Sequence, residues 1–293
     1  MFHKIAILGP GLLGASLMQA VRQRGLAGHI ATWSRRAETR ARCAGRPWCD
    51  SVHETPAACV SGADLVVACV PVDKIGESLA AAATALAPGV LVTDVGSTKA
   101  SVCREALTVL PASAVFIGSH PMAGSEKSGL EHATPALFEG RVCFITPPRI
   151  PAPDKLAALG QFWQALGMVT VEVAPEEHDA IVAHTSHLPH FAAAALSVAL
   201  HRCPAAWRDF SGPGLRDTTR VAAGDPGLWR AVAKDNSKEL LLALDSLQAE
   251  LGTVRAALAA GDFDAVQTFL QCAKTWRDGM GAPPRSAPAP VAG

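Results

Sequence analysis

The chain has 293 residues, no tyrosine, and 26 Lys and Arg against 26 Asp and Glu, so its formal net charge is zero with neutral histidine. This length allows one large domain or two modest ones, and 49% hydrophobic against 18% charged residues indicates a folded core rather than disorder. A pI of about 7.1 gives no basic field for nucleic acid, and the longest apolar run, residues 191–200, is too short for a membrane span. We therefore expect neither nucleic acid nor a membrane as a partner.

The chain up to residue 173 alternates short apolar or β-branched runs with helical stretches. Several of the runs are continuously apolar, which is typical of strands covered on both faces of a sheet. The pattern predicts a helix at 12–24 and strands at 4–8, 29–33, 65–70, 90–94, 115–118, 142–146 and 168–173. Such alternation indicates the α/β class, with a doubly wound and mostly parallel sheet over residues 1–173.

Beyond Pro175 the strand pattern stops, and residues 174–280 are predicted to form an all-α domain. Helices are expected at 176–199, 228–258 and 262–276, with Asp262 as an N-cap and Gly/Pro breaks at 212–214 and 224–227. The long second helix carries an apolar stripe that a small domain does not cover by itself, so we expect a homodimer. The Pro/Ala-rich residues 281–293 are predicted to be a disordered tail.

The eight cysteines include no CxxC pair and no zinc-type spacing. Their even number allows disulfides, but a chain of this size with a full core does not need them. The N-terminal residues also lack the apolar segment and cleavage site of a secretory signal. We expect a reducing, cytoplasmic location.

A glycine motif, GPGLLG at 9–14, fits the GxGxxG pattern of dinucleotide-binding turns. It directly follows a predicted strand and opens a predicted helix, and this context separates a Rossmann cofactor site from a glycine-rich turn without a ligand. The helix N-terminus would offer N–H groups and a positive dipole end to a pyrophosphate. The expected cofactor-binding residues are Gly9, Gly11, Leu12, Leu13, Gly14, Ser34, Arg35, Arg36, Val70 and Pro71.

The end of the second strand bears on the choice between NADP and NAD. An NAD site normally has a carboxylate about 20 residues beyond the glycines, whereas this chain has Ser34, Arg35 and Arg36 there. A hydroxyl and two guanidinium groups can bind a 2′-phosphate, so NADP is expected in preference to NAD. The alternative is that both arginines simply begin a solvated helix.

Four segments are unusual for a plain nucleotide-binding fold. The first two follow predicted strands and would lie at the carboxyl edge of the sheet, where open α/β sheets bind ligands. The other two lie in the helical part. The segments are DVGSTK at 94–99, SHPMAGSEKSG at 119–129, TSHLPH at 185–190, and GLRDTTRVA at 214–222.

With these segments in combination, the chain resembles the prephenate/arogenate dehydrogenase (TyrA) family of tyrosine biosynthesis over about residues 3–276. The resemblance implies a Rossmann domain, a helical dimerisation domain, and oxidative decarboxylation of prephenate or arogenate to an aromatic product. In contrast to some relatives, we expect no chorismate mutase segment before residue 3 and no regulatory domain after residue 276, so any feedback by tyrosine is expected to act at the active site.

The resemblance assigns roles to individual side chains. His120 matches the base that takes the substrate hydroxyl proton, a task that suits a histidine near neutral pH. Ser97 matches the serine that bonds this hydroxyl, although Ser97 or Thr98 could merely cap the next helix. The matching substrate-binding residues are Arg220, His187, His190, Glu126, Ser125 and Asp217. Without the resemblance, the Arg220–Asp217 pair would be interpreted as an ordinary surface pair.

Three alternatives remain at this level. His184, His187 and His190 recur every third residue, but no carboxylate or cysteine completes a metal set, so no metal is expected. Lys234 could instead be the catalytic lysine of a β-hydroxyacid dehydrogenase or imine reductase, and a non-catalytic NADP-binding redox sensor would need only the cofactor site. The sequence leaves prephenate against arogenate open.

Overall fold

The structure, a computed structural model, describes residues 2–124, 129–147, 150 and 152–281. Its central element is a six-stranded parallel sheet with the strand order β3-β2-β1-β4-β5-β6. This is the order of a dinucleotide-binding Rossmann sheet. The strands are β1 (Phe2–Leu8), β2 (Ala27–Trp33), β3 (Ser51–His53), β4 (Leu65–Ala68), β5 (Leu91–Asp94) and β6 (Val115–Phe116).

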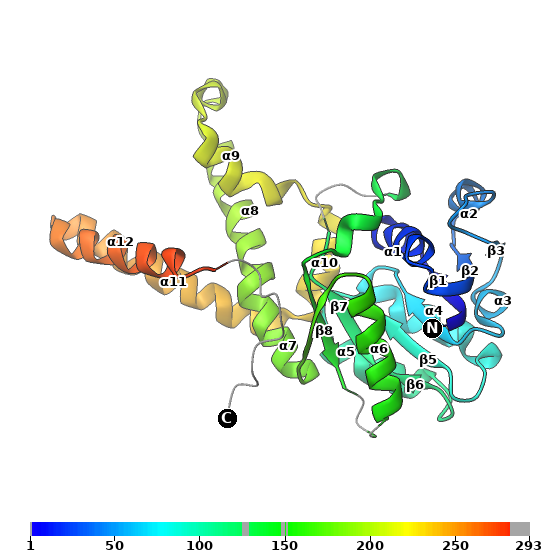
Figure 1. Ribbon diagram of the computed structural model, residues 1–293. Coiled ribbons are helices and arrows are strands. Elements are labelled where there is room, and N and C mark those ends of the chain that lie inside the picture. The colour runs from blue at the N-terminus through cyan, green and yellow to red at the C-terminus, as the bar shows by residue number, and fades with distance from the viewer. Residues whose placement is uncertain (1, 125–128, 148–149, 151, 282–293) are drawn as a thin grey trace.

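Both faces of this sheet are covered by helices, as the apolar runs predict (Figure 1). In β1, Ile5 and Ile7 pack into one core cluster while Ala6 and Leu8 pack into the other, because successive side chains of a strand point to opposite faces. The first cluster includes side chains of α1 (Leu12–Gln23), α2 (Ala37–Cys43) and α6 (Pro153–Ala165). The second includes side chains of α3 (Pro56–Val60), α4 (Ile75–Ala82) and α5 (Ala100–Val109).

A second, smaller sheet continues from the last strand of the first. It has the order β7-β8-β9, with β7 (Gly118–Pro121) antiparallel to β8 (Val142–Thr146) and β8 parallel to β9 (Val169–Glu172). The single strand predicted at 115–118 is therefore wrong, because the chain leaves the large sheet at Ile117 and joins another. Pairing of His120 with Phe144 buries the histidine in this small sheet.

The rest of the described chain is helical, which confirms the predicted class of an α/β domain followed by an all-α domain. Its α-helices are α7 (Pro175–Val182), α8 (Leu188–His201), α9 (Pro213–Thr219), α10 (Pro226–Asp235), α11 (Ser237–Ala260) and α12 (Phe263–Asp278). Short 3-10 turns are η1 (Val72–Lys74), η2 (Ala83–Ala85), η3 (Leu130–His132), η4 (Pro135–Phe138), η6 (Ala205–Phe210) and η7 (Arg220–Ala223).

Two of the predicted helices are interrupted. The helix expected at 176–199 contains one π-helical turn, Ala183–His187, before α8 begins with Pro189 in its first turn. Proline has no N–H to continue the regular ladder, and π-turns are frequent at functional sites. The helix expected at 228–258 breaks at Asn236 into α10 and α11. The N-cap predicted at Asp262 is confirmed, since its carboxylate accepts from the Ala265 N–H at 2.9 Å.

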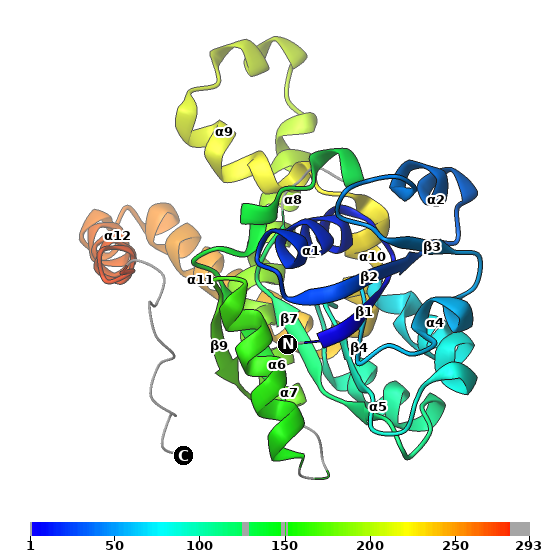
Figure 2. The same ribbon diagram turned by 45° about the vertical axis from the view of Figure 1, so that its right-hand side comes forward.

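Helices α11 and α12 pack against each other and project away from the sheet domain (Figures 1 and 2). Several large apolar side chains on this hairpin are exposed: Leu241, Leu251, Leu258, Phe263, Leu270 and Trp276. No helix in the described ranges is both long and apolar enough to cross a membrane. Of the predicted tail, all but Gly281 lies outside the described residues.

Candidate active site

The glycine turn between β1 and α1 has the shape that a dinucleotide site needs. Gly9 adopts φ +100°, and a Cβ on Gly14 would lie 2.2 Å from the Gly9 carbonyl oxygen, so both positions exclude a side chain. A Cβ on Gly11 would meet nothing within 4 Å, which leaves open space over the turn. Gly11 is the N-cap of α1, and no described side chain caps that helix. Its first N–H groups are therefore available to a pyrophosphate.

The other predicted cofactor residues surround this turn. Leu12 and Leu13 form the first turn of α1. Val70 follows β4, and its Cγ1 would be 2.8 Å from a Cβ on Gly9, while Pro71 is exposed beside it. Ser34, Arg35 and Arg36 follow β2, where both arginine side chains are exposed.

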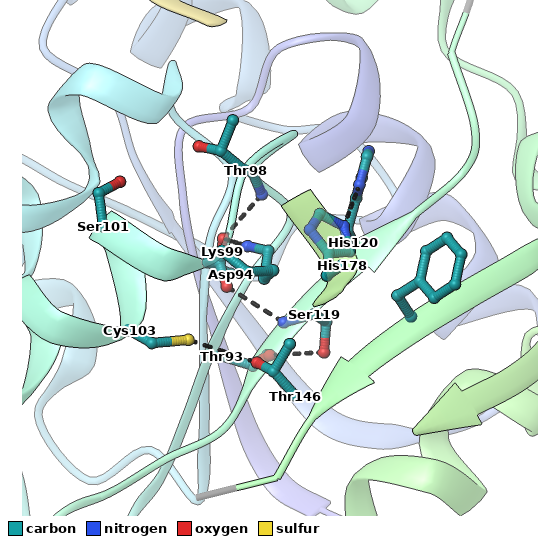
Figure 3. Close-up of polar contacts among 12 residues, drawn as sticks. Thr93, Asp94, Thr98, Lys99, Ser101, Cys103, Ser119, His120, Thr146 and His178 are labelled. Atoms are coloured by element: carbon teal, nitrogen blue, oxygen red, sulfur yellow. Dashed lines mark hydrogen bonds and ion pairs between the residues drawn. The ribbon is translucent and has the colours of Figure 1, made fainter. Parts of the chain in front are cut away.

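Asp94, the last residue of β5, organises the backbone around the ends of β5 and β7. Its carboxylate accepts from the Gly96 N–H at 2.8 Å and from the Ser119 N–H at 3.1 Å, and it forms an ion pair with Lys99 (Figure 3). Both side chains of this pair are fully buried. The carboxylate thus joins the turn after β5 to strand β7, and it fixes the backbone next to His120.

A chain of hydrogen bonds leads from His120 to a buried carboxylate. His120 Nδ1 lies 2.9 Å from His178 Nε2 (Figure 3), and His178 Nδ1 lies 2.8 Å from Asp179 Oδ1. Asp179 also accepts from the Lys99 N–H at 2.7 Å and from the Ala100 N–H at 2.9 Å, at the start of α5. The carboxylate can only accept, so neutral His178 carries its proton on Nδ1 and accepts from His120 Nδ1–H. This leaves His120 Nε2 as the basic nitrogen.

Electrostatics keep these groups in the forms that this scheme requires. Burial holds the pKa of His120 well below its ordinary value, and the neighbouring His178 and Lys99 lower it further. Burial also lowers the pKa of His178, against the opposing effect of Asp179. Burial alone would raise the pKa of Asp179, but hydrogen bonds from His178, Ala100 and Lys99 outweigh it and hold the pKa below its usual value. His120 is therefore neutral at pH 7 and able to accept a proton.

Two further histidines carry buried nitrogens without a described partner. They are His187 Nε2 and His190 Nδ1, on residues only 1% and 7% exposed. His190 stacks on Trp229 with ring centroids 3.5 Å apart, and His187 meets the same indole edge-on. Burial lowers the pKa of His187 to about 4 and lowers that of His190, and it outweighs the opposing effect of backbone hydrogen bonds to Ser97 and Val221. Buried polar atoms are usually hydrogen-bonded, so we expect these two nitrogens to face ligand groups.

Three further predicted site residues, Ser97, Arg220 and Asp217, lie on separate elements. Ser97 is half-buried between β5 and α5. The capping alternative for Ser97 and Thr98 is not observed, because Asp179 accepts from the first α5 N–H groups and Thr98 donates to Asp235. Arg220 begins η7, which packs against α8, and Asp217 is exposed on α9. Ser125 and Glu126 lie outside the described residues.

The end of α10 ties the helical domain to α5. Asp235 accepts from the hydroxyls of Thr98 and Ser101, and Asn236 Nδ2 donates to the Asp179 carbonyl at 2.8 Å and approaches His187 Nδ1 at 3.3 Å. Lys234 is exposed beside them. Asp235 and Asn236 thus form a junction between the domains, and Lys234 takes no part in it.

The sequence analysis gave no role to His178, Asp179, Trp229, Asp235 or Asn236. The adjacent His178 and Asp179 at the start of a predicted helix were a usable signal, since a carboxylate next to a histidine can orient its ring. Within the described residues, no group of three or more His, Cys, Asp or Glu is arranged to hold a metal ion. His184 is exposed, and its Nδ1 lies 3.1 Å from the Ala180 carbonyl oxygen.

Comparisons with known proteins agree with this architecture. The family model for the nucleotide-binding domain of prephenate dehydrogenase matches residues 17–172, and that for its dimerization domain matches residues 174–272. The cyclohexadienyl dehydrogenase of Zymomonas mobilis is 33% identical over 267 residues, which cover 90% of this chain and 91% of that protein.

Solved structures show the same two-domain arrangement. The prephenate dehydrogenase of A. aeolicus in complex with hydroxyphenyl propionate and NAD+ has a TM-score of 0.87 at 26% identity, covering 94% of this chain and 98% of that one. Synechocystis arogenate dehydrogenase has a TM-score of 0.80 at 29% identity, covering 94% and 99%. The chain therefore belongs to the prephenate dehydrogenase family and is a nicotinamide-nucleotide-dependent dehydrogenase of tyrosine biosynthesis.

Proposed function

We propose that this chain converts prephenate, arogenate or both to an aromatic product by oxidative decarboxylation, with NADP+ preferred over NAD+. The observation that carries the proposal is the His120–His178–Asp179 chain, which presents a neutral base beside a dinucleotide-binding sheet. Relatives named for prephenate, arogenate and cyclohexadienyl substrates support the substrate class.

The reaction divides between cofactor and protein. A nicotinamide held at the glycine turn would supply the acceptor for the hydride on the substrate carbon that carries the 4-hydroxyl. His120 Nε2 takes the hydroxyl proton, and His178 and Asp179 stabilise the imidazolium that forms. The C–C bond to the ring carboxylate then breaks, CO2 leaves, and the electron pair completes the aromatic ring as a phenolate, which takes the proton back from His120. We assign Ser97 to the substrate hydroxyl and His187, His190 and Arg220 to its polar groups, with Asp217, Ser125 and Glu126 supporting them.

The test follows reduction of NADP+ by the purified protein with prephenate, then arogenate, then a 3-hydroxyacid. We expect turnover with one or both of the first two. His120→Asn should lower kcat by at least about 10²-fold, with little change in KM, because it removes acid/base catalysis and leaves binding intact. Turnover with the 3-hydroxyacid alone, or an unaffected His120→Asn, would contradict the proposal.

The preference for NADP+ is supported by the exposed Arg35 and Arg36 at the end of β2, with Ser34 before them. These groups can form charge-assisted hydrogen bonds to a 2′-phosphate. The corresponding measurement is kcat/KM with both cofactors, where a clear preference for NAD+ would contradict this part.

The assembly proposed is a homodimer formed through the helical domain. The matched dimerization domain and the exposed apolar residues on the α11–α12 hairpin support it. Sedimentation velocity would give the mass directly. We also propose a cytoplasmic location, which the eight free cysteines of the described chain support.

A further inference from the structure

The turn after β2 is held by an arginine that does not itself belong to the turn. Arg40, on α2, donates from Nη1 to the carbonyl oxygens of Ser34 at 2.8 Å and Arg35 at 3.1 Å. Within the turn, the Arg36 N–H donates weakly to Ser34 Oγ at 3.4 Å. Arg40 is half-buried, whereas Arg35 and Arg36 are exposed. One guanidinium therefore fixes the two consecutive peptide groups that position the Ser34 and Arg35 side chains.

The other arginines of this region have different contacts. Arg42 forms an ion pair with Glu131 at 2.8 Å, and Arg46 Nε donates to the Arg42 carbonyl at 3.1 Å. Neither contact involves the 34–36 turn. Removing Arg46 therefore takes one positive charge from the segment that follows α2 and leaves the contacts of the turn unchanged, which makes it a control for Arg40.

A fixed turn matters because a phosphate monoester carries close to two negative charges near neutral pH. Carbonyl oxygens that turned towards such a group would repel it, and flexible donors would lose conformational entropy on binding it. Arg40 acts against both effects, since it engages the two carbonyls and orders the backbone before any ligand arrives.

We propose that Arg40 is a positioning residue for cofactor selectivity, which prepares the Ser34–Arg36 turn to bind a phosphate monoester on the adenosine ribose. This inference rests on the proposed preference for NADP+. It makes selectivity depend on a residue that need not touch the phosphate. Arg35 and Arg36 supply the charge, and Arg40 supplies the conformation in which Ser34 and Arg35 present their donors.

The experiment measures binding of 2′,5′-ADP and 5′-AMP to the full chain by calorimetry, without turnover. The ratio of the two affinities isolates the 2′-phosphate. In the wild type we expect 2′,5′-ADP to bind more tightly. Arg40→Ala should reduce the affinity ratio by about 10-fold, equivalent to the loss of about 1.4 kcal/mol. Arg46→Ala should reduce it by less than about 2-fold, as expected for a solvent-screened charge that does not contact the turn.

A second variant keeps the test informative if Arg40→Ala is poorly folded. Arg40→Gln retains an amide that can donate to one carbonyl, so its affinity ratio should lie between those of the wild type and Arg40→Ala. If the wild type prefers 2′,5′-ADP but Arg40→Ala and Arg46→Ala behave alike, Arg40 has no positioning role and the NADP+ preference stands. If the wild type binds both probes equally, the NADP+ preference is overturned together with this inference, while the dehydrogenase reaction is unaffected.

Discussion

Asp179 performs two tasks with one carboxylate. It accepts from His178 Nδ1, which sets the proton positions along the chain to His120, and it accepts from the first N–H groups of α5. A negative charge at a helix N-terminus is itself favourable, so the carboxylate remains ionised although it is buried. The catalytic base is thus oriented by a group that also anchors the helix following Ser97.

Asp179→Asn should lower kcat by about 10²-fold while changing the substrate KM little, because the charge that stabilises the imidazolium is lost. The variant also has a signature in the pH profile. His120 must be neutral to act, and removing the nearby anion makes protonation less favourable, so the acid limb of kcat should move to lower pH. Steady-state kinetics across pH would measure both effects.

Asp235→Asn is the control for this variant, since Asp235 also contacts the start of α5 but has no described contact with His178. The acid limb of the pH profile of kcat should lie at the same pH in Asp235→Asn as in the wild type. If Asp179→Asn lost stability but kept an unshifted limb, Asp179 would be only a structural anchor.

At the level of elements, the break between α10 and α11 connects the two domains. Asn236 reaches from the break to the Asp179 carbonyl, while Asp235 bonds the Thr98 and Ser101 hydroxyls at the end of α5 nearest the site. An uninterrupted helix over 228–258 would lack the change of direction at this point. The interruption therefore gives the helical domain a fixed position on the sheet domain.

This junction predicts energetic coupling between residues of the two domains. Asp235→Asn and Thr98→Val should each reduce the free energy of unfolding, by about 1 kcal/mol, as expected for a hydrogen bond to a charged group that is partly solvated. The double variant should lose less than the sum of the two single losses, because both changes act on the same bond: Asp235→Asn removes the charge of its acceptor and Thr98→Val removes its donor. Urea unfolding of the four proteins would measure the coupling.

This double-mutant cycle needs a reference variant at a residue that does not contact Asp235. Thr55→Ala removes the N-cap of α3, whose hydroxyl accepts from the Ala58 N–H, and it has no described contact with Asp235. Combined with Asp235→Asn it should be additive within about 0.5 kcal/mol. Additivity of Thr98→Val with Asp235→Asn would show that the two residues do not stabilise the junction together.

On the scale of the whole molecule, the features that could be predicted from the sequence are those formed by residues close together in the chain. The glycine turn, the buried strands and the Asp262 cap depend on residues close together in the chain, so periodicity and motif spacing were sufficient. The contacts that complete the site are not local: His120 and His178 are 58 residues apart, and Thr98 and Asp235 are 137 apart. The break at Asn236 also escaped prediction, because tertiary hydrogen bonds rather than glycine or proline mark it. The functional roles of the individual site residues remain predictions.

The buried histidines make the stability of the folded chain depend on pH. Burial lowers the pKa of His120, His178, His187 and His190, so each is neutral in the native state while the unfolded chain binds protons below its ordinary pKa of 6.5. Stability from these groups is therefore fully present above pH 6.5 and decreases as the pH falls. For His187, whose pKa is lowered to about 4, the loss between pH 7.5 and pH 5 should be about 2 kcal/mol.

Urea unfolding at these two pH values, on the wild type and on His187→Gln, isolates this contribution. The variant removes the titrating ring, so its loss of stability between the two pH values should be about 2 kcal/mol smaller than that of the wild type. His184→Gln is the control, because it replaces an exposed histidine of the same π-helical turn and leaves the His187 ring in place. Equal losses in all three proteins would mean that His187 is not held neutral by the fold, and its buried Nε2 would then no longer mark a ligand position.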